Sequence, residues 1–178
     1  MAAYVDRCVL LSLLLGDSGY DDSERWLLSQ GDQSLWISHW VLLEVAGVIA
    51  TCVRRGQLTA EQAQTIGSEF ESFRQERLTL IEPRGTDFLQ ARQWLERCLQ
   101  LPLRMGEALH LPLAEPQQLT VVSADRALAG CAEILGLQVF AVEAPTKKSP
   151  CHYLQIVVVC CLLSSCWLND PSNLARSI

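Results

Sequence analysis

The chain has 178 residues, 49% of them hydrophobic, and a formal net charge of −6. This length suffices for one well-buried domain and is too short for two. The acidic balance excludes a protein that holds nucleic acid mainly through a broad basic surface, because that mode needs many basic side chains to neutralise phosphates. A nucleic-acid enzyme remains consistent with the charge if metal ions supply the missing positive charge.

The first predicted elements place an aspartate at the junction of a strand and a helix. A short β-type segment at Ala3–Val5 runs directly into an apolar stretch, residues 9–15, that closes at Gly16. This stretch is too long for a typical strand, and the glycine is typical of a helix end. We therefore expect a buried helix whose start follows Asp6.

A second acidic residue lies inside a long apolar segment. Asp21 and Asp22 predict a helix that runs to Leu28, and Leu35–Ser38 predicts a short strand. Residues 40–55 are then mostly apolar, which is typical of a buried helix, and they contain Glu44. An unpaired buried carboxylate is costly, so we expect Glu44 to pair with a partner such as an arginine or to line a polar cleft.

Two amphipathic helices and a strand occupy the middle of the chain. A capping box at residues 59–62 begins the first helix, whose apolar face is formed by Ala63, Ile66, Phe70 and Phe73. Leu78–Ile81 predicts a strand. The second helix carries Phe88, Ala91, Leu95 and Leu99 on its apolar face.

The last third of the domain contains a helix with an unfavourable proline. A helix is predicted at residues 104–111, and Pro112 must disturb it because proline cannot donate a hydrogen bond to the Ala108 carbonyl. Thr120–Ser123 predicts a buried strand, Asp125 is a candidate helix cap, and residues 137–142 predict the last strand.

The alternation of strands and helices favours a parallel sheet covered by helices on both faces. Ligands of such sheets bind beyond the carboxyl ends of the strands, where the strand order reverses. Asp6 and Asp125 both follow a predicted strand directly. We therefore expect a site at this edge of the sheet.

A change in composition marks a boundary near Pro145. Before this point the chain contains arginine but no lysine; the only lysines are Lys147 and Lys148. Four of the eight cysteines also follow the boundary. The predicted domains are thus residues 1–144 and a C-terminal tail, residues 145–178. The apolar stretch 153–168 is shorter than the roughly 20 residues of a bilayer-spanning helix, so a membrane anchor is not favoured.

The earlier cysteines and the start of the chain favour a cytoplasmic location. Cys8, Cys52, Cys98 and Cys131 have irregular spacings without zinc-site form, which predicts reduced thiols in the core. Residues 8–15 could pass for the apolar part of a signal peptide, but Asp6 and Arg7 cancel in charge and no cleavage site follows.

Taken singly, each acidic residue has an ordinary structural explanation. Asp6 and Asp125 could cap helices, and Glu107 could form a solvent-facing pair with Arg104, three residues earlier. Ser123 could be a hydroxyl at a strand end. Taken together, clustered carboxylates would repel one another unless hard cations such as Mg²⁺ or Mn²⁺ lay between them. The four residues to which this applies are Asp6, Glu44, Glu107 and Asp125.

Four stretches, in chain order, carry these acids. They are Tyr4-Val-Asp6, Ser38-His-Trp-Val-Leu-Leu-Glu44, Leu103-Arg-Met-Gly-Glu-Ala-Leu-His-Leu111 and Val121-Val-Ser-Ala-Asp125-Arg-Ala-Leu128. In this order they resemble the PIN-domain nucleases, most closely the VapC-type toxin ribonucleases of type II toxin-antitoxin systems. The resemblance covers nearly all of residues 1–144. It implies a three-layer α/β/α fold with a central, mainly parallel sheet.

The resemblance also implies a function and roles for individual residues. It implies a Mg²⁺- or Mn²⁺-dependent endoribonuclease that hydrolyses RNA. It also implies that a small antitoxin blocks the enzyme and that the enzyme forms a homodimer. The metal-binding and catalytic acids would be Asp6, Glu44, Glu107 and Asp125. Ser123 would support them, and Arg104 and Arg126 are candidates for phosphate contacts, as are Arg54 and Arg55.

Departures from the family pattern leave other interpretations open. Glu107 stands where the family usually has aspartate, and Arg7 and Cys8 replace hydroxyl residues that commonly follow the first aspartate. One alternative is therefore a catalytically weakened PIN fold that binds protein or RNA, and another is a phosphohydrolase of a different α/β fold. His110 is interpreted as a helix-packing residue, and Trp26 with its two neighbouring leucines as either interface or core.

Overall fold

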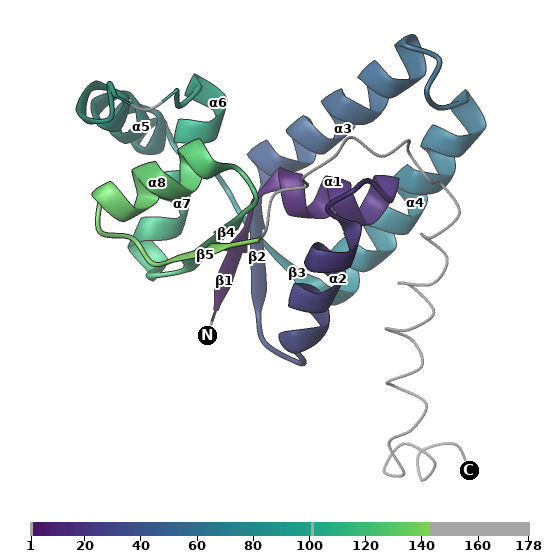
Figure 1. Ribbon diagram of the computed structural model, residues 1–178, viewed down its shortest axis with the longest axis horizontal. Helices are drawn as coiled ribbons and strands as arrows, with labels where there is room; N and C mark the ends of the chain where they lie inside the picture. Colours follow the sequence, from purple (N-terminus) through teal and green to yellow (C-terminus); the bar gives the residue numbers. More distant parts are fainter. Residues whose placement is uncertain (1, 101, 143–178) are drawn as a thin grey trace, which may run out of the picture.

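The computed structural model describes residues 2–100 and 102–142, drawn in colour in Figure 1. The predicted tail, residues 145–178, lies outside the described residues. The strands are β1 (Ala3–Val5), β2 (Leu35–Ser38), β3 (Leu78–Ile81), β4 (Thr120–Ser123) and β5 (Val139–Ala141). The helices are α1 (Arg7–Leu15), α2 (Tyr20–Ser29), α3 (His39–Arg54), α4 (Ala60–Arg77), α5 (Gly85–Arg97), α6 (Met105–Ala108), α7 (His110–Ala114), the 3₁₀ helix η1 (Glu115–Gln117) and α8 (Arg126–Ile134).

The five strands form one parallel sheet in the order β3-β2-β1-β4-β5. The chain first moves outward from β1 through β2 to β3 and then returns to place β4 on the other side of β1. In the register, Ala3 of β1 faces Leu35 of β2 and Thr120 of β4. The strand order therefore reverses between β1 and β4, which is where the sequence predicted the site.

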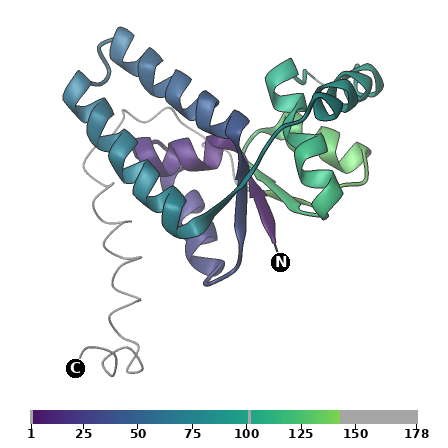
Figure 2. The ribbon, with the colours of Figure 1, turned by 180° about the vertical axis from the view of Figure 1, so that it is seen from behind.

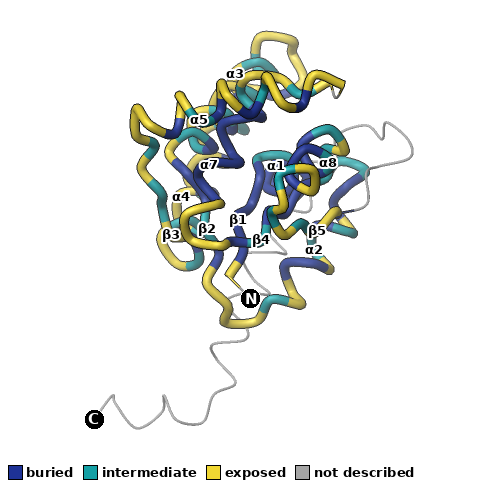
Figure 3. The backbone as a smooth tube through the Cα atoms, turned by 90° about the vertical axis from the view of Figure 1, so that its left-hand side faces the viewer, coloured by how far each residue is buried: buried dark blue, intermediate teal, exposed yellow. Residues whose placement is uncertain are grey.

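Helices cover both faces of this sheet, as predicted. Figures 1 and 2 show α1 to α4 on one side and α5 to α8 on the other. The central strands β1, β2 and β4 are mostly buried, whereas the edge strands β3 and β5 are partly exposed (Figure 3). Val5, Ile37 and Val121 are at most 1% exposed, and burying each such side chain contributes roughly 1.5–3 kcal/mol. This packing fixes the carboxyl ends of the central strands.

Pro112 changes the local helix more than expected. A single helix over residues 104–111 is wrong: α6 ends at Ala108, Leu109 forms a turn, and α7 begins at His110. Pro112 lies in the first turn of α7, where a backbone N–H needs no partner within the helix. His110, the first residue of α7, is fully buried in the protein core.

Other sequence expectations have clear outcomes. Gly16 ends α1 in the left-handed conformation with φ of 60°, and the capping box between Thr59 and Gln62 is present at the start of α4. Trp26 and Leu27 belong to the core, whereas Leu28 is exposed. Within residues 2–100 and 102–142, no helix combines the length and the apolar character that crossing a bilayer requires.

Candidate metal centre

Asp6 lies between β1 and α1, and neighbouring side chains hold one of its carboxylate oxygens. Its side chain makes no capping hydrogen bond to α1, so the simple N-cap explanation is wrong for this residue. Instead, Oδ2 accepts hydrogen bonds from the Ser123 hydroxyl at 2.7 Å and the Cys8 thiol at 2.9 Å. Burial and the charge of Asp6 raise the pKa of Cys8, so the thiol stays protonated and donates. Cys8 thus replaces the expected hydroxyl.

Glu44 has the arginine partner that its buried position predicted. Oε1 of Glu44 forms an ion pair with the guanidinium of Arg7, and the Glu44 side chain is only 8% exposed. Burial alone would lower the pKa of Arg7, but the charges of Glu44 and Asp6 outweigh this effect and raise it. Arg7 therefore remains a cation at the edge of the acidic cluster.

Glu107 is held by two arginines. Its Oε2 accepts a hydrogen bond from the backbone N–H of Arg104 at 3.0 Å, and its Oε1 lies 3.7 Å from Arg7 Nη2 and 3.6 Å from Arg104 Nη1. The sequence predicted that Glu107 and Arg104 form a pair facing solvent. They do pair, but only the Arg104 side chain is exposed, whereas Glu107 is buried. Arg7 consequently lies between Glu44 and Glu107.

Asp125 caps α8, as one reading of the sequence predicted. Its Oδ1 accepts hydrogen bonds from the backbone N–H groups of Ala127 at 2.7 Å and Leu128 at 3.1 Å. The Asp125 N–H in turn donates to the Ser123 hydroxyl, which donates to Asp6. Ser123 therefore connects the carboxyl ends of β1 and β4, but the Asp125 carboxylate itself is engaged with its own helix.

His110, interpreted from the sequence as a helix-packing residue, is buried and also lies in the acidic cluster. Its ring is fully buried; Nδ1 lies 2.9 Å from the Tyr4 hydroxyl, and that hydroxyl lies 2.9 Å from the Ser38 hydroxyl. Burial raises the pKa of Tyr4, so the phenol stays protonated. On the other side of the ring, Nε2 lies 3.4 Å from Asp6 Oδ1 and 3.1 Å from Glu44 Oε2. Spacing offers one signal, since His110 follows Glu107 by three residues.

These contacts bring together part of the predicted site and add to it. One donor atom each from Asp6, Glu44 and His110 lie within 4.8 Å of one another. Glu107 contacts this group through Arg7, and Asp125 contacts it through Ser123. The donor set of two carboxylates and one imidazole fits a divalent cation. Among the described side chains, Glu44 Oε2 and His110 Nε2 are buried without a hydrogen-bond partner, which is further evidence of a fit.

The candidate phosphate-binding arginines occupy different positions. Arg104 and Arg126 are exposed and start, or directly precede, helices at the same edge of the sheet as the acids. Arg54 ends α3, ten residues after Glu44, which places it roughly 15 Å further along the helix. Arg54 and Arg55 are therefore poorly placed for a phosphate at the acidic cluster.

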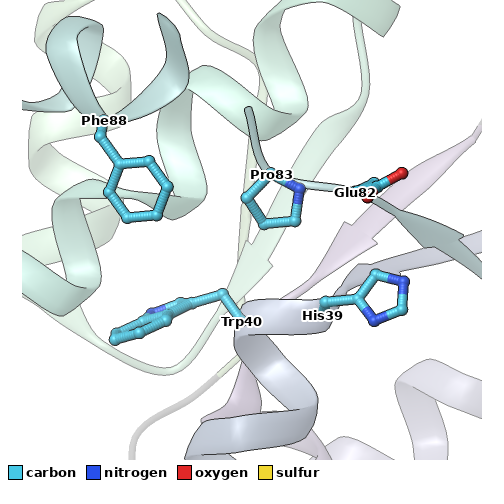
Figure 4. Close-up of a pocket in the computed structure, with 5 residues that line it drawn as sticks. All are labelled: His39, Trp40, Glu82, Pro83 and Phe88. Atoms are coloured by element: carbon cyan, nitrogen blue, oxygen red, sulfur yellow. The ribbon is translucent and has the colours of Figure 1, made fainter. Parts of the chain in front are cut away.

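An open pocket of about 340 Å³ lies beside the start of α3. His39, Trp40, Glu82, Pro83 and Phe88 line it. In Figure 4 the rings of Phe88 and Pro83 lie on one side of the pocket and Trp40 and His39 on the other. The Trp40 indole donates a hydrogen bond to the carbonyl of Gly106 at 3.1 Å, so the pocket wall is joined to α6 directly beside Glu107.

The model of the PIN domain family matches residues 3–133. The chain belongs to the PIN domain family. No curated protein matches the chain in sequence. The PIN fold of this chain is similar to several solved structures, all at low sequence identity.

Three of these structures illustrate the likeness. FitAcB from Neisseria gonorrhoeae is 18% identical with a TM-score of 0.59, over 79% of this chain and 96% of that one. VapBC2 from Rickettsia felis, bound to a DNA fragment from its promoter, is 18% identical with a TM-score of 0.61, over 79% and 98%. VapC20 from Mycobacterium tuberculosis, described as a toxin that cleaves the sarcin-ricin loop, is 16% identical with a TM-score of 0.57, over 73% and 94%. At these identities the likeness shows a shared fold.

Proposed function

We propose that this PIN-domain protein is a divalent-metal-dependent endoribonuclease that acts as the toxin of a toxin-antitoxin pair. The observation that carries the proposal is the buried acidic cluster at the β1–β4 edge of the sheet. Three carboxylates, from Asp6, Glu44 and Glu107, gather there; Arg7 pairs with Glu44 and Glu107, and the exposed Arg104 also lies beside Glu107. This excess of buried negative charge favours a bound cation, and PIN domains are generally nucleases.

The residues would divide the work as follows. Asp6 and Glu44 would hold the ion, Mg²⁺ or Mn²⁺, with Glu107 and Asp125 completing the acidic site. When bound, the ion lowers the pKa of a coordinated water and neutralises charge on the departing oxygen of a phosphodiester. Ser123 orients Asp6 by holding its second oxygen.

Two arginines would contribute positive charge to substrate binding. The side chain of Arg7 is 27% exposed while its guanidinium pairs with Glu44. Arg104 is 80% exposed and lies 3.6 Å from Glu107. Both can therefore approach a phosphate of the substrate without giving up their carboxylate partners.

The pocket beside the cluster supports a single-stranded or looped RNA substrate. Trp40 and Phe88 offer aromatic faces to an unpaired base, and such stacking is available only when the base is not already in a duplex. Because Trp40 is hydrogen-bonded to Gly106, a base held there would keep its phosphates near Glu107. The chain's negative charge also favours recognition by stacking over recognition by a broad basic surface.

The proposed antitoxin and second copy would use exposed apolar side chains. Leu43 on α3, Leu89 on α5 and Met105 on α6 are 62%, 61% and 85% exposed. These side chains are apolar surface that a partner chain would cover. The structural relative VapC20 is described as a toxin.

A second candidate function is a PIN fold that binds RNA or protein without cutting. Arg7 favours this alternative, because its guanidinium already neutralises Glu44 and Glu107. Cleavage assays with purified protein separate the two functions. We expect cleavage of single-stranded RNA with Mn²⁺ or Mg²⁺, none with EDTA, and a loss of roughly 100-fold or more in Asp6→Asn, since removing one pre-arranged charged group at a reacting centre costs that much.

Asp32→Asn is the matched control, because Asp32 is exposed in the α2–β2 connection. RNA binding without metal-dependent cleavage would favour the binding module and contradict the nuclease proposal. Cleavage that persists in EDTA would contradict the metal roles of these acids. Turnover of small phosphate esters without cleavage of RNA would favour a phosphohydrolase.

A further inference from the structure

Three side chains at the centre share one arrangement: a neighbour holds one polar atom and the other faces the cluster. Asp6 has Oδ2 held by Ser123 and Cys8, while Oδ1 faces His110. Glu44 has Oε1 held by Arg7, while Oε2 faces His110. His110 has Nδ1 beside Tyr4, while Nε2 faces both carboxylates.

The atoms that face the cluster are close together without being hydrogen-bonded. Nε2 of His110 and Oε2 of Glu44 are 3.1 Å apart, yet each is buried without a hydrogen-bond partner, so they are near but not aligned. A buried imidazole nitrogen left in this state costs free energy. Two ligands of a metal at roughly 2.1 Å lie about 3.0–3.4 Å from each other, depending on the coordination geometry. The separations of 3.1 and 3.4 Å at His110 match this spacing.

We propose that Nε2 of His110 is a direct ligand of the divalent metal, together with Asp6 Oδ1 and Glu44 Oε2. The inference deepens the proposed function, since it rests on a metal at the acidic cluster, and it assigns a nitrogen donor to a site otherwise read as all-oxygen. Imidazole suits Zn²⁺ and other first-row transition metals better than Mg²⁺, which prefers oxygen ligands. A nitrogen ligand therefore shifts the preference of the site away from Mg²⁺ and towards transition metals, of which Mn²⁺ is the spectroscopic probe.

The residues behind His110 are arranged as such a ligand requires. A metal-binding histidine donates its other ring N–H to an acceptor, which fixes the tautomer and the ring orientation. Here the Tyr4 hydroxyl lies 2.9 Å from Nδ1 and 2.9 Å from the Ser38 hydroxyl, so the Tyr4 oxygen is the acceptor that Nδ1–H would use in the metal-bound tautomer. Ser38 also accepts the backbone N–H of Val41 as the cap of α3. In that tautomer, the contacts from His110 through Tyr4 to Ser38 leave the lone pair of Nε2 directed at the carboxylates.

Arg7 leaves room for this ion. Its guanidinium engages Oε1 of Glu44 and faces Oε1 of Glu107, whereas the metal would take Oε2 of Glu44. The two cations would thus lie on opposite sides of one carboxylate. Glu107, which is outside the three-donor group, would keep its arginine partners.

Pulsed electron paramagnetic resonance of Mn²⁺ bound to the EDTA-treated full chain tests the assignment without RNA. A directly coordinated imidazole couples its ¹⁴N nucleus to the manganese electrons. We expect this coupling in the wild type and in His39→Ala, a control that removes an exposed histidine at the start of α3. In His110→Ala the coupling should vanish, and Mn²⁺ affinity should fall by more than the roughly 10–100-fold that loss of a supporting residue causes. Mg²⁺ affinity should fall less.

The outcomes separate this inference from the proposed function. Mn²⁺ that binds without ¹⁴N coupling, or with coupling that survives in His110→Ala, overturns the role of His110 and leaves an all-carboxylate metal site intact. Failure of the wild type to bind Mn²⁺ overturns both. If His110→Ala does not fold, coupling that persists in the double variant His39→Ala/His152→Ala, which keeps His110 as its single histidine, still assigns the nitrogen to His110.

Discussion

At the scale of single residues, the chemistry of the site depends on which atom of each side chain is already engaged. Asp6 and Glu44 could be selected from the sequence because one follows a strand and the other interrupts an apolar helix. His110 could not, because its contacts with Tyr4 and Asp6 join positions more than 100 residues apart. The ion pair of Arg7 with Glu44 depends on a similar long-range contact, which local spacing does not specify.

The ion pairs of Arg7 lead to a testable change in metal affinity. In Arg7→Ala, the carboxylates of Glu44 and Glu107 lose their cationic partner, so they should bind a divalent ion more tightly. We expect Mn²⁺ affinity measured by calorimetry to rise at least about tenfold, since a unit charge about 4 Å away is worth about 1 kcal/mol in water and about 4 kcal/mol at an effective dielectric constant near 20. Without metal, the variant should melt at a lower temperature, and Mn²⁺ should raise its melting temperature more than that of the wild type.

Two further variants make this result specific. Arg7→Lys keeps the charge and should bind Mn²⁺ with nearly wild-type affinity. Arg25→Ala removes an exposed arginine that pairs with Asp22 on α2, and it should have no effect. Unchanged or weaker Mn²⁺ binding by Arg7→Ala would mean that the guanidinium does not compete with the metal for these carboxylates.

At the scale of elements, the sequence predicted types and order better than details around α6 and α7. Strands β2, β3 and β4 have the predicted bounds because their β-branched and apolar residues end at clear turn signals. The sequence predicted one helix over residues 104–111, but the helix breaks at Leu109, and Pro112 lies in the first turn of the next helix. His110, the part of the site that the sequence did not predict, is the first residue after that break.

Asp125 caps α8 and also has a proposed metal role, and two substitutions separate these roles. Asp125→Ala should lower the free energy of unfolding by about 1 kcal/mol, the usual cost of removing an N-cap. Asp125→Ser should keep the cap and nearly the full stability in urea unfolding, while losing the carboxylate. If the carboxylate serves the metal, both variants should lose RNA cleavage. Full cleavage by Asp125→Ser would restrict Asp125 to capping α8.

At the scale of the whole molecule, the parallel order β3-β2-β1-β4-β5 is what gathers acids from distant parts of the chain. The alternation of strands and helices was sufficient to predict this sheet, its two helical layers and the edge that carries the site. It was not sufficient to predict which carboxylate oxygens face one another, because that depends on side-chain contacts between layers.

The stability of the whole fold should fall in alkaline solution. Burial, with a further contribution from neighbouring Cys98, raises the pKa of Cys131 from 9.0 to about 12, and burial also raises the pKa values of Cys8 and Tyr4. The unfolded chain releases these protons at lower pH than the folded chain. For Cys131 the stabilisation is therefore complete below about pH 9 and is lost as the pH rises towards 12, by about 1.4 kcal/mol per pH unit.

Urea unfolding under reducing conditions between about pH 8 and pH 10.5 measures this slope. Cys131→Ala should unfold with a shallower pH dependence than the wild type, whatever its stability at neutral pH. Cys52→Ala, at a half-buried position in α3, is the matched control and should keep the wild-type slope. Equal slopes in Cys131→Ala and the wild type would show that Cys131 does not carry this linkage.

The central claim is that the β1–β4 edge of this PIN domain binds a divalent metal among its acidic residues. Anomalous diffraction from crystals of the protein soaked in Mn²⁺ tests it most directly. We predict a manganese peak bounded by Asp6, Glu44 and His110, absent from crystals of Asp6→Asn. A cluster without manganese, in which arginine side chains alone balance the carboxylates, would contradict metal binding at this edge of the sheet.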